Sequence, residues 1–415
     1  MTVNDQRGVV SRRGLLRLFG AAVGSTPLLA ACDGSRPFAP ARRPVARIAS
    51  APGVAAGTIT LGSIYPLTGP AAGYASVVQT MDAYFKKVND DGGINGRTVR
   101  FLVEDDQYSP VNTLPLAKKL MEQDQVFALV GDLGTTTTSA IADYTTSRRT
   151  PLLFVVSGSD VWGDVSKYPY AVGLQVPYPA EGRALGRYIT GAWPGNKVGL
   201  LYQNDDFGRE YLACKETLGA NNPFVGEETY DAPARDLSQQ VKNLRAKGAQ
   251  VVILIATAKP AGLALKAAAD LGWKPNIVMS SVAEDGSVFG LAGGTANVEG
   301  VISDTWQRSY DDGSPEVQAV KDLLAKYAPQ VQFAQSPVTG YIVALLVVES
   351  LRRAGPNPTR ESLMGAAESF RNFAVPQLLP GSVVSTSKTD HSPVKSLQLT
   401  RATNGRFVPF GSLVS

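Results

Sequence analysis

Short apolar runs alternate with amphipathic stretches along most of the chain from Thr58 onward. Short apolar runs bounded by turn residues are typical of buried strands, and apolar side chains at every third or fourth position are typical of helices. The first series predicts strands at 59–64, 98–104, 126–130 and 152–156, with helices at 76–88, 111–122 and 139–147. The second series predicts strands at 198–202, 224–230, 251–255 and 277–280, with helices at 180–188, 209–218, 237–247 and 260–271. Because this alternation is typical of parallel sheets, we expect an α/β fold with two doubly wound lobes.

The N-terminal region has a different pattern, in which arginines precede an apolar run at 18–31. This run is shorter than the roughly 20 residues of a transmembrane helix and indicates an export signal peptide at 1–31. The segment SRRGLLR at 11–17 resembles the twin-arginine export signal, and the general export route stays open. The segment LAAC, which ends at Cys32, resembles the lipobox of bacterial lipoproteins, whose cysteine is lipidated. We therefore expect an exported protein with a lipid on Cys32.

The residues that follow Cys32 predict a tether. Residues 32–56 are rich in Pro, Ala and Arg, a composition that favours an extended linker. It would hold the globular body off the outer face of the cytoplasmic membrane, in the periplasm or at the cell surface. A later apolar segment, 338–351, is 14 residues long and predicts a buried helix rather than a membrane span.

Charge and composition exclude several classes of function. The first 31 residues hold four arginines and one aspartate, which leaves 36 basic and 35 acidic groups downstream. This balance provides no basic surface for nucleic acid. The single histidine, His391, lies in a turn-like stretch and is read as a surface or hinge residue, and neither a nucleophile elbow nor a metal-ligand spacing is present. We predict no catalytic residue, no metal site and no cofactor. With Cys32 lipidated, Cys214 has no disulfide partner and is expected to be a small hydrophobic core residue on an amphipathic helix.

One strand end offers a site for an anion. The predicted strand at 126–130 ends at Gly131, and Gly134 with the threonines at 135–138 would open the next helix. Backbone N–H groups and hydroxyls at such a position can bind a carboxylate. Capping of the helix by Thr135 or Thr136 is the simpler alternative, and the two roles can coexist. The absence of a lysine in this run argues against a nucleotide phosphate.

Several motifs in order along the chain resemble the branched-chain amino-acid (Leu/Ile/Val) binding proteins of ABC importers. They are LTGP at 67–70 with Tyr74, NDDGGINGR at 89–97, EDD at 104–106, GDLGTTT at 131–137 and NDDFG at 204–208. The resemblance covers nearly the whole body and implies the type I periplasmic binding protein fold, with two lobes and a three-strand hinge. It places lobe 1 at 57–175 plus 305–375 and lobe 2 at 176–304 plus 376–415, with passages between the lobes near Gln175, Asp304 and 373–385.

The same resemblance implies the residues of a ligand site. These are Tyr74, Leu133, Gly134, Thr135, Thr136, Ser157, Gly158, Phe207, Thr257 and Ser281. The last two depart from the family, which has an aromatic residue at the position of Thr257 and, at that of Ser281, an acidic residue that pairs with the ligand's ammonium. Glu284 and Asp285 lie close enough to substitute, although a solvated turn is the simpler interpretation of both. We therefore expect a ligand with a carboxylate that need not carry an α-ammonium group.

The resemblance implies a monomeric receptor that captures a small amino acid, organic acid or amide and docks on the permease subunits of an ABC importer. Two other functions stay open at this point. The same fold can serve a ligand sensor that feeds a signalling partner. An exported α/β enzyme is the other alternative, although no catalytic motif supports it.

Overall fold

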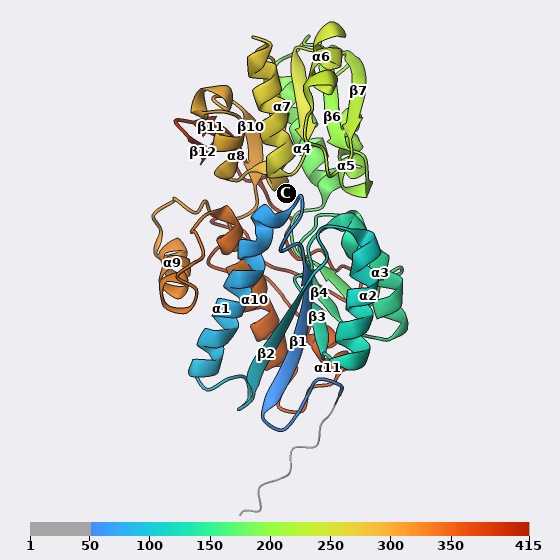
Figure 1. Cartoon of the computed structure of the whole chain (residues 1–415), viewed down its shortest axis with the longest axis vertical. Helices are drawn as coiled ribbons and strands as arrows, with labels where there is room; N and C mark the ends of the chain where they lie inside the picture. Colours follow the sequence, from blue (N-terminus) through green and yellow to red (C-terminus); the bar gives the residue numbers. More distant parts are fainter. Residues whose placement is uncertain (1–50, 415) are drawn as a thin grey trace, which may run out of the picture. The chain divides into compact units, whose positions relative to one another are not determined.

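The computed structural model describes residues 51–414, which contain two sheets (Figure 1). The export signal, Cys32 and most of the predicted tether lie outside the described residues. The first sheet has five parallel strands in the order β2-β1-β3-β4-β5. These strands are β1 (Thr58–Tyr65), β2 (Thr98–Asp105), β3 (Ala128–Val130), β4 (Leu152–Val155) and β5 (Ala171–Gly173). We call this sheet and the helices packed on it the first lobe.

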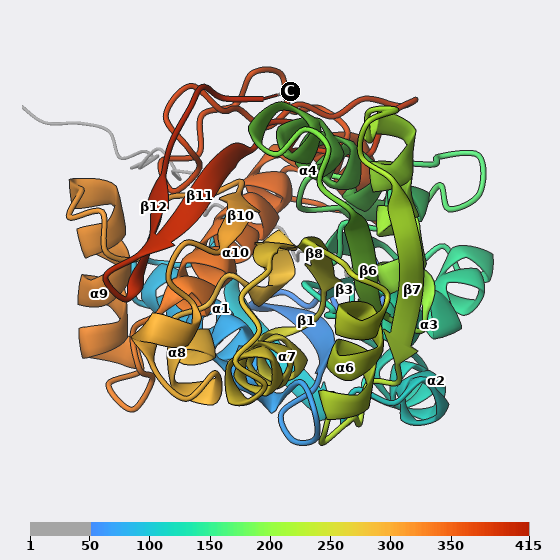
Figure 2. The same cartoon turned by 90° about the horizontal axis from the view of Figure 1, so that it is seen from above.

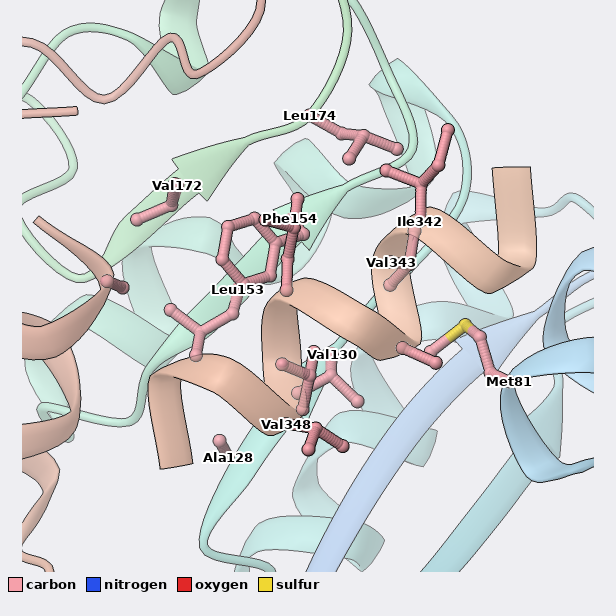
Figure 3. Packing of buried hydrophobic residues seen from close by; sticks show 14 of the residues in the cluster. Met81, Ala128, Val130, Leu153, Phe154, Val172, Leu174, Ile342, Val343 and Val348 are labelled. Atoms are coloured by element: carbon pink, nitrogen blue, oxygen red, sulfur yellow. The ribbon is translucent and has the colours of Figure 1, made fainter. Parts of the chain in front are cut away.

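Helices from two distant parts of the chain cover the first sheet. They are α1 (Ala75–Asp90), α2 (Pro110–Lys118), α3 (Thr135–Ser147), α9 (Pro315–Tyr327), α10 (Gln335–Arg353) and α11 (Arg360–Ala367). A π-helical turn at Lys119–Gln123 extends α2. Figure 3 shows side chains of α10, such as Ile342 and Val343, against those of β3, β4 and β5. The apolar segment at 338–351 is therefore a buried helix, as predicted.

The second sheet is mixed, in the order β12-β11-β10-β9-β8-β6-β7 (Figure 2). Its strands are β6 (Val198–Gln203), β7 (Phe224–Tyr230), β8 (Val251–Ile255), β9 (Asn276–Met279), β10 (Ile302–Thr305), β11 (Gln398–Thr403) and β12 (Arg406–Pro409). The strands β6 to β10 pair in parallel, whereas β10–β11 and β11–β12 are antiparallel. The second lobe is therefore a parallel α/β sheet with an antiparallel hairpin at one edge, which the sequence patterns did not predict.

Both faces of the second sheet are buried beneath helices. These are α4 (Tyr178–Ala192), α5 (Asp206–Glu210), α6 (Ser238–Ala246), α7 (Ala258–Asp270) and α8 (Ser287–Leu291). Along β8, Val252 and Leu254 join one apolar cluster, while Val251, Ile253 and Ile255 join the other. A strand buried on both faces carries an unbroken apolar run, which explains why β8 was recognisable from the sequence.

The segment predicted as a helix at 209–218 differs from the prediction. The α-helix ends at Glu210, and residues 211–217 form a 3-10 helix against α4. A side chain at Gly186 would lie 2.3 Å from the carbonyl oxygen of Cys214, so the two segments approach closely because position 186 is glycine. Cys214 is buried in this contact, and burial raises the pKa of its thiol to about 12.

The chain passes between the lobes three times. The first two passages follow β5 and β10. The third lies later than the predicted 373–385, because apolar side chains up to Leu397 pack in the first-lobe cluster and β11 begins at Gln398. His391 belongs to this stretch and is buried, with Nδ1 2.6 Å from the carbonyl oxygen of Ala171. It is therefore a core residue rather than a surface one.

Candidate functional site

A cavity lies between the lobes, where the carboxyl ends of strands from both sheets meet. Such strand ends are where open parallel sheets bind ligands. The space amounts to about 720 Å³ when its mouth toward solvent is counted. Its walls are formed by Tyr74, Val77, Tyr108, Leu133, Gly134, Thr135, Val156, Gln175, Tyr178, Phe207, Thr257, Ser281, Val282, Glu284, Asp285, Trp306, Gln307, Gln335, Ser336 and Thr339.

The N-terminus of α3 forms part of the first-lobe wall. Its N-cap is Gly134, with φ of 103°, so no side chain caps the helix. A Cβ at this position would lie 2.8 Å from the ring of Tyr108 and 2.5 Å from Oγ1 of Thr137. The first backbone N–H groups of a helix have no acceptor within the helix. Glycine thus leaves the positive end of α3 open at the cavity wall.

The threonines of α3 hydrogen-bond elsewhere instead of capping the helix. Oγ1 of Thr135 lies 2.8 Å from Oγ of Ser157, which follows β4. Thr136 donates a hydrogen bond to a carboxylate oxygen of Asp205 in the second lobe, at 3.1 Å. Capping by Thr135 or Thr136, the simpler interpretation of the sequence, is therefore wrong.

Ser157 and Gly158 lie behind the cavity wall. The hydroxyl of Tyr178 accepts a hydrogen bond from the backbone N–H of Gly158 and is also bonded to the side chain of Ser157. A Cβ at Gly158 would lie 2.6 Å from the ring of Tyr178. The structure therefore places Tyr178, which the sequence reasoning missed, over two predicted ligand-binding residues.

The predicted residues of the second lobe line the cavity. Phe207 packs edge-on against Tyr178, with ring centroids 5.2 Å apart. Thr257 is the residue before α7, and its side chain does not cap that helix. Ser281 donates hydrogen bonds from its backbone N–H and its hydroxyl to Glu181, both at 2.8 Å. Ser281 thus faces a buried carboxylate of its own lobe.

A network of three carboxylates lies beneath this wall. Glu181 and Asp304 are both 1% exposed, and their side chains are hydrogen-bonded to each other. Burial raises the pKa of Glu181, and burial together with the charge of Glu181 raises that of Asp304 well above its ordinary value. Burial also raises the pKa of Glu284 to about 8, despite hydrogen bonds from Thr400 and Ser303. The network therefore holds protons at neutral pH.

Glu284 and Asp285 both line the cavity, whereas the sequence reasoning favoured a solvated turn. Glu284 accepts a hydrogen bond from Thr400 on β11, and Asp285 accepts one from the backbone N–H of Ser287 at 2.9 Å. No lysine, arginine or histidine is among the residues that line this cavity. Its two carboxyl side chains, Glu284 and Asp285, both belong to the second lobe.

Direct hydrogen bonds join the two lobes around the cavity. The hydroxyl of Tyr74 donates to the carbonyl oxygen of Val282 and accepts from the backbone N–H of Ala258. Glu210 of the second lobe accepts hydrogen bonds from the hydroxyl of Ser159 and from the backbone N–H of Asp160. Burial raises the pKa of Glu210 to about 7. These contacts hold the lobes together around the cavity.

Among the predicted site residues, the structure brings seven together on the cavity wall, and Thr136, Ser157 and Gly158 lie outside it. The seven are Tyr74, Leu133, Gly134, Thr135, Phe207, Thr257 and Ser281. Sequence reasoning missed a set of polar and aromatic residues near the passages between the lobes. Gln175 lies two residues after β5 and Trp306 directly after β10, and the sequence patterns predicted neither strand.

Within residues 51–414, no cluster of side chains has the composition of a metal site, and no helix is long and apolar enough to span a membrane. The arrangement provides hydrogen-bond donors at one wall, acidic groups at the other and aromatic faces between them. Its geometry suits non-covalent capture of a small molecule.

The chain is similar to known periplasmic binding proteins in sequence and in structure. A family model described as periplasmic binding protein matches residues 58–406. A Leu/Ile/Val-binding protein homologue of Brucella suis is 24% identical over 336 residues, which cover 73% of this chain and 80% of that protein. The structure of a branched-chain amino-acid ABC transporter protein from Thermus thermophilus with bound valine has a TM-score of 0.79 and 22% identity, covering 86% of this chain and 96% of that one. A fatty acid ABC transporter substrate-binding protein from Thermomonospora curvata has a TM-score of 0.79 and 22% identity, covering 88% and 94%.

Proposed function

The chain belongs to the periplasmic binding protein family, and we propose that it is the extracytoplasmic receptor of an ABC importer for a small carboxylate-bearing ligand. The ligand is an amino acid or a related organic acid or amide. Two similar structures are named for branched-chain amino acids and for fatty acids, ligands that share a carboxylate. The protein acts by capture and delivery and catalyses no reaction on its ligand.

The observation that carries this proposal is the open N-terminus of α3 at the cavity wall. Its uncapped backbone N–H groups follow Gly134 and stand beside the Thr135 hydroxyl. A carboxylate at such a position gains hydrogen bonds of about 1 kcal/mol each, and the helix dipole adds roughly 0.3–1 kcal/mol. Aromatic side chains, among them Tyr108 and Phe207, would enclose the rest of the ligand.

The second-lobe wall bears on whether the ligand carries an ammonium group. Ser281 is committed to Glu181, which supports a ligand that does not require an ammonium at that position. Glu284 and Asp285 line the same cavity and would accept hydrogen bonds from an ammonium if the ligand carries one. The proposal therefore covers amino acids and simple carboxylic acids alike.

Attachment to the membrane forms a separate part of the proposal. Export followed by lipidation of Cys32 would hold the receptor at the outer face of the cytoplasmic membrane, as a monomer that docks on the permease. Replacing Cys32 with Ser should leave unprocessed precursor and abolish labelling with an acyl precursor. Persistent labelling of this variant would contradict the anchor and leave the ligand proposal unaffected.

A thermal-shift screen tests the ligand proposal. The panel contains amino acids, short organic acids, amides and aromatic acids. A ligand at 100 times its Kd stabilises the native state by about 2.7 kcal/mol, which raises Tm measurably. Thr135→Ala should weaken every ligand that shifts the wild type, whereas Thr146→Ala, at the other end of α3, should not. A panel in which no carboxylate raises Tm would overturn the proposal.

A further inference from the structure

The cavity has a third wall, formed where the chain passes between the lobes. It consists of Gln175 after β5, Trp306 and Gln307 after β10, and Ser336 and Thr339 from the first turns of α10. This hinge wall is rich in amide and hydroxyl groups. In a site for a purely apolar ligand body, such positions would be expected to carry aliphatic side chains.

Three polar side chains of the hinge wall have no hydrogen-bond partner among residues 51–414, although they are almost fully buried. Gln175 is 9% exposed, Trp306 5% and Ser336 7%, and all three line the cavity. Buried polar side chains are hydrogen-bonded in the large majority of cases. Their unused donors and acceptors are therefore available to whatever occupies the cavity.

Other polar side chains beside these three are hydrogen-bonded within the protein. The Gln307 and Thr339 side chains hydrogen-bond each other, with Nε2 to Oγ1 at 2.9 Å. The side chain of Gln335 accepts from the backbone N–H of Tyr310 and donates to the carbonyl oxygen of Arg308. These pairs fix the wall in place, so the three unpartnered groups stand on a rigid support.

The N-terminus of α10 adds donors at the same place. Its N-cap is Ala334, which provides no capping side chain, and the helix is 19 residues long. Ser336 lies in its first turn, where the backbone N–H groups of Gln335 and Ser336 have no acceptor within the helix, while Pro337 has no N–H. Together with the Trp306 indole N–H, these groups favour an oxygen acceptor on the ligand. The Gln175 carbonyl and the Ser336 hydroxyl can in turn accept from a donor.

The charge of the cavity decides between a charged and a neutral group. No basic side chain lines it, and its two carboxyl groups, Glu284 and Asp285, offer no positive charge. A second carboxylate on the ligand would add negative charge with no cation to balance it. A neutral group that both accepts and donates hydrogen bonds satisfies the wall without this cost.

We infer that the hinge wall is a second polar subsite, in which Gln175, Trp306 and Ser336 bind a neutral carboxamide at the far end of the ligand. The inference rests on the proposed function, since the carboxylate at α3 supplies the other end. The ligand class is then a short carboxylate with a terminal carboxamide, with or without an α-ammonium group.

Two matched pairs of probes test this subsite by calorimetric titration. Glutaramate is compared with hexanoate, and L-glutamine with L-norleucine; within each pair, an alkyl end replaces the carboxamide. We expect the carboxamide member of at least one pair to bind 10-fold or more tighter, because a site built around hydrogen bonds rejects an analogue that lacks them. Gln175→Leu and Ser336→Ala should each reduce this preference about fivefold, the loss of one hydrogen bond.

The thermal stability of Gln175→Leu, compared with that of Thr339→Val, provides a readout that needs no ligand. Gln175→Leu removes an unpartnered group and should leave Tm unchanged or higher, whereas Thr339→Val breaks a formed pair and should lower it. Equal or tighter binding of the alkyl probes would overturn the subsite. Binding of none of the four probes, when other carboxylates shift Tm, would also overturn it. If no carboxylate binds at all, the proposed function itself fails.

Discussion

The hydroxyl of Tyr74 donates a hydrogen bond to the backbone carbonyl oxygen of Val282 across the cavity, at 2.9 Å. It also accepts one from the backbone N–H of Ala258 at 3.0 Å. One side chain of the first lobe is therefore bound to two loops of the second, those after β8 and β9. Burial raises the pKa of this hydroxyl far above its ordinary value, so it stays protonated at physiological pH.

Tyr74→Phe should loosen the contact between the two lobes around the cavity, the closed form of the protein. The variant loses both hydrogen bonds, each contributing about 1 kcal/mol, and leaves the Ala258 N–H without its acceptor. We expect a larger radius of gyration in X-ray scattering and weaker ligand binding by roughly 5- to 30-fold. Tyr84→Phe on α1 removes a hydroxyl outside the cavity and serves as the control. Indistinguishable scattering and affinity for the two variants would contradict a role for Tyr74 in closure.

Contact between Glu210 and the Ser159 loop should depend on pH. Burial in the closed form raises the pKa of Glu210 to about 7 from its ordinary 4.5. The stabilisation from the protonated form is complete below about pH 4.5 and is lost as pH rises through about 7. Scattering should therefore show more open molecules at pH 8 than at pH 5.5. Glu210→Gln should weaken this dependence, whereas Glu216→Gln, on the exposed side of the same segment, should retain it.

The carboxylate network should make the protein less stable in alkali. Because the folded-state pKa of Asp304 is raised, its contribution to stability is present at low pH and is lost as pH rises. Asp304→Asn stays neutral and can still donate to Glu181. Its Tm should exceed that of the wild type at pH 9 by a wider margin than at pH 5. Asp270→Asn, on the surface of α7, is the control, and an equal response of the two variants would count against the network.

Gly134→Ala should damage both folding and binding. The residue has φ of 103°, and the added methyl group would meet the Tyr108 ring and the Thr137 hydroxyl. Backbone strain of this kind costs about 1–3 kcal/mol, and the contacts add to it. Gly191→Ala in α4, where nothing lies within 4 Å, should instead be neutral or stabilising by up to about 1 kcal/mol. Thermal unfolding of both variants measures these effects. Equal Tm values would contradict the requirement for glycine at position 134.

The first-lobe wall could be predicted because its signals are local. A buried strand, two glycines and a run of threonines define the turn from β3 into α3, and both ends of the motif lie within ten residues. The bulge in β4, where Phe154 has φ of 56°, left no comparable signal. Residues that directly follow a strand with a clear apolar run could therefore be predicted from the sequence, as at the turn from β3 into α3.

The rest of the cavity depends on distant contacts. Glu284 faces inward because it bonds to Thr400 on β11, a strand that the patterns did not predict. Ser336 precedes the apolar run of α10, which indicated burial and nothing about the cavity. Gln175 lies in a short connection with no periodic pattern. Glu284, Ser336 and Gln175 come together only where the chain passes between the lobes. A single sequence does not show which segments meet there.

A crystal structure with the strongest ligand from the thermal-shift screen would show directly whether a carboxylate binds at the N-terminus of α3. We predict density for the ligand between the lobes, with its carboxylate at the N-terminus of α3 beside Gly134 and Thr135. Density elsewhere, such as in the surface groove near Trp273 of the second lobe, with the space between Tyr74 and Glu284 empty, would contradict it.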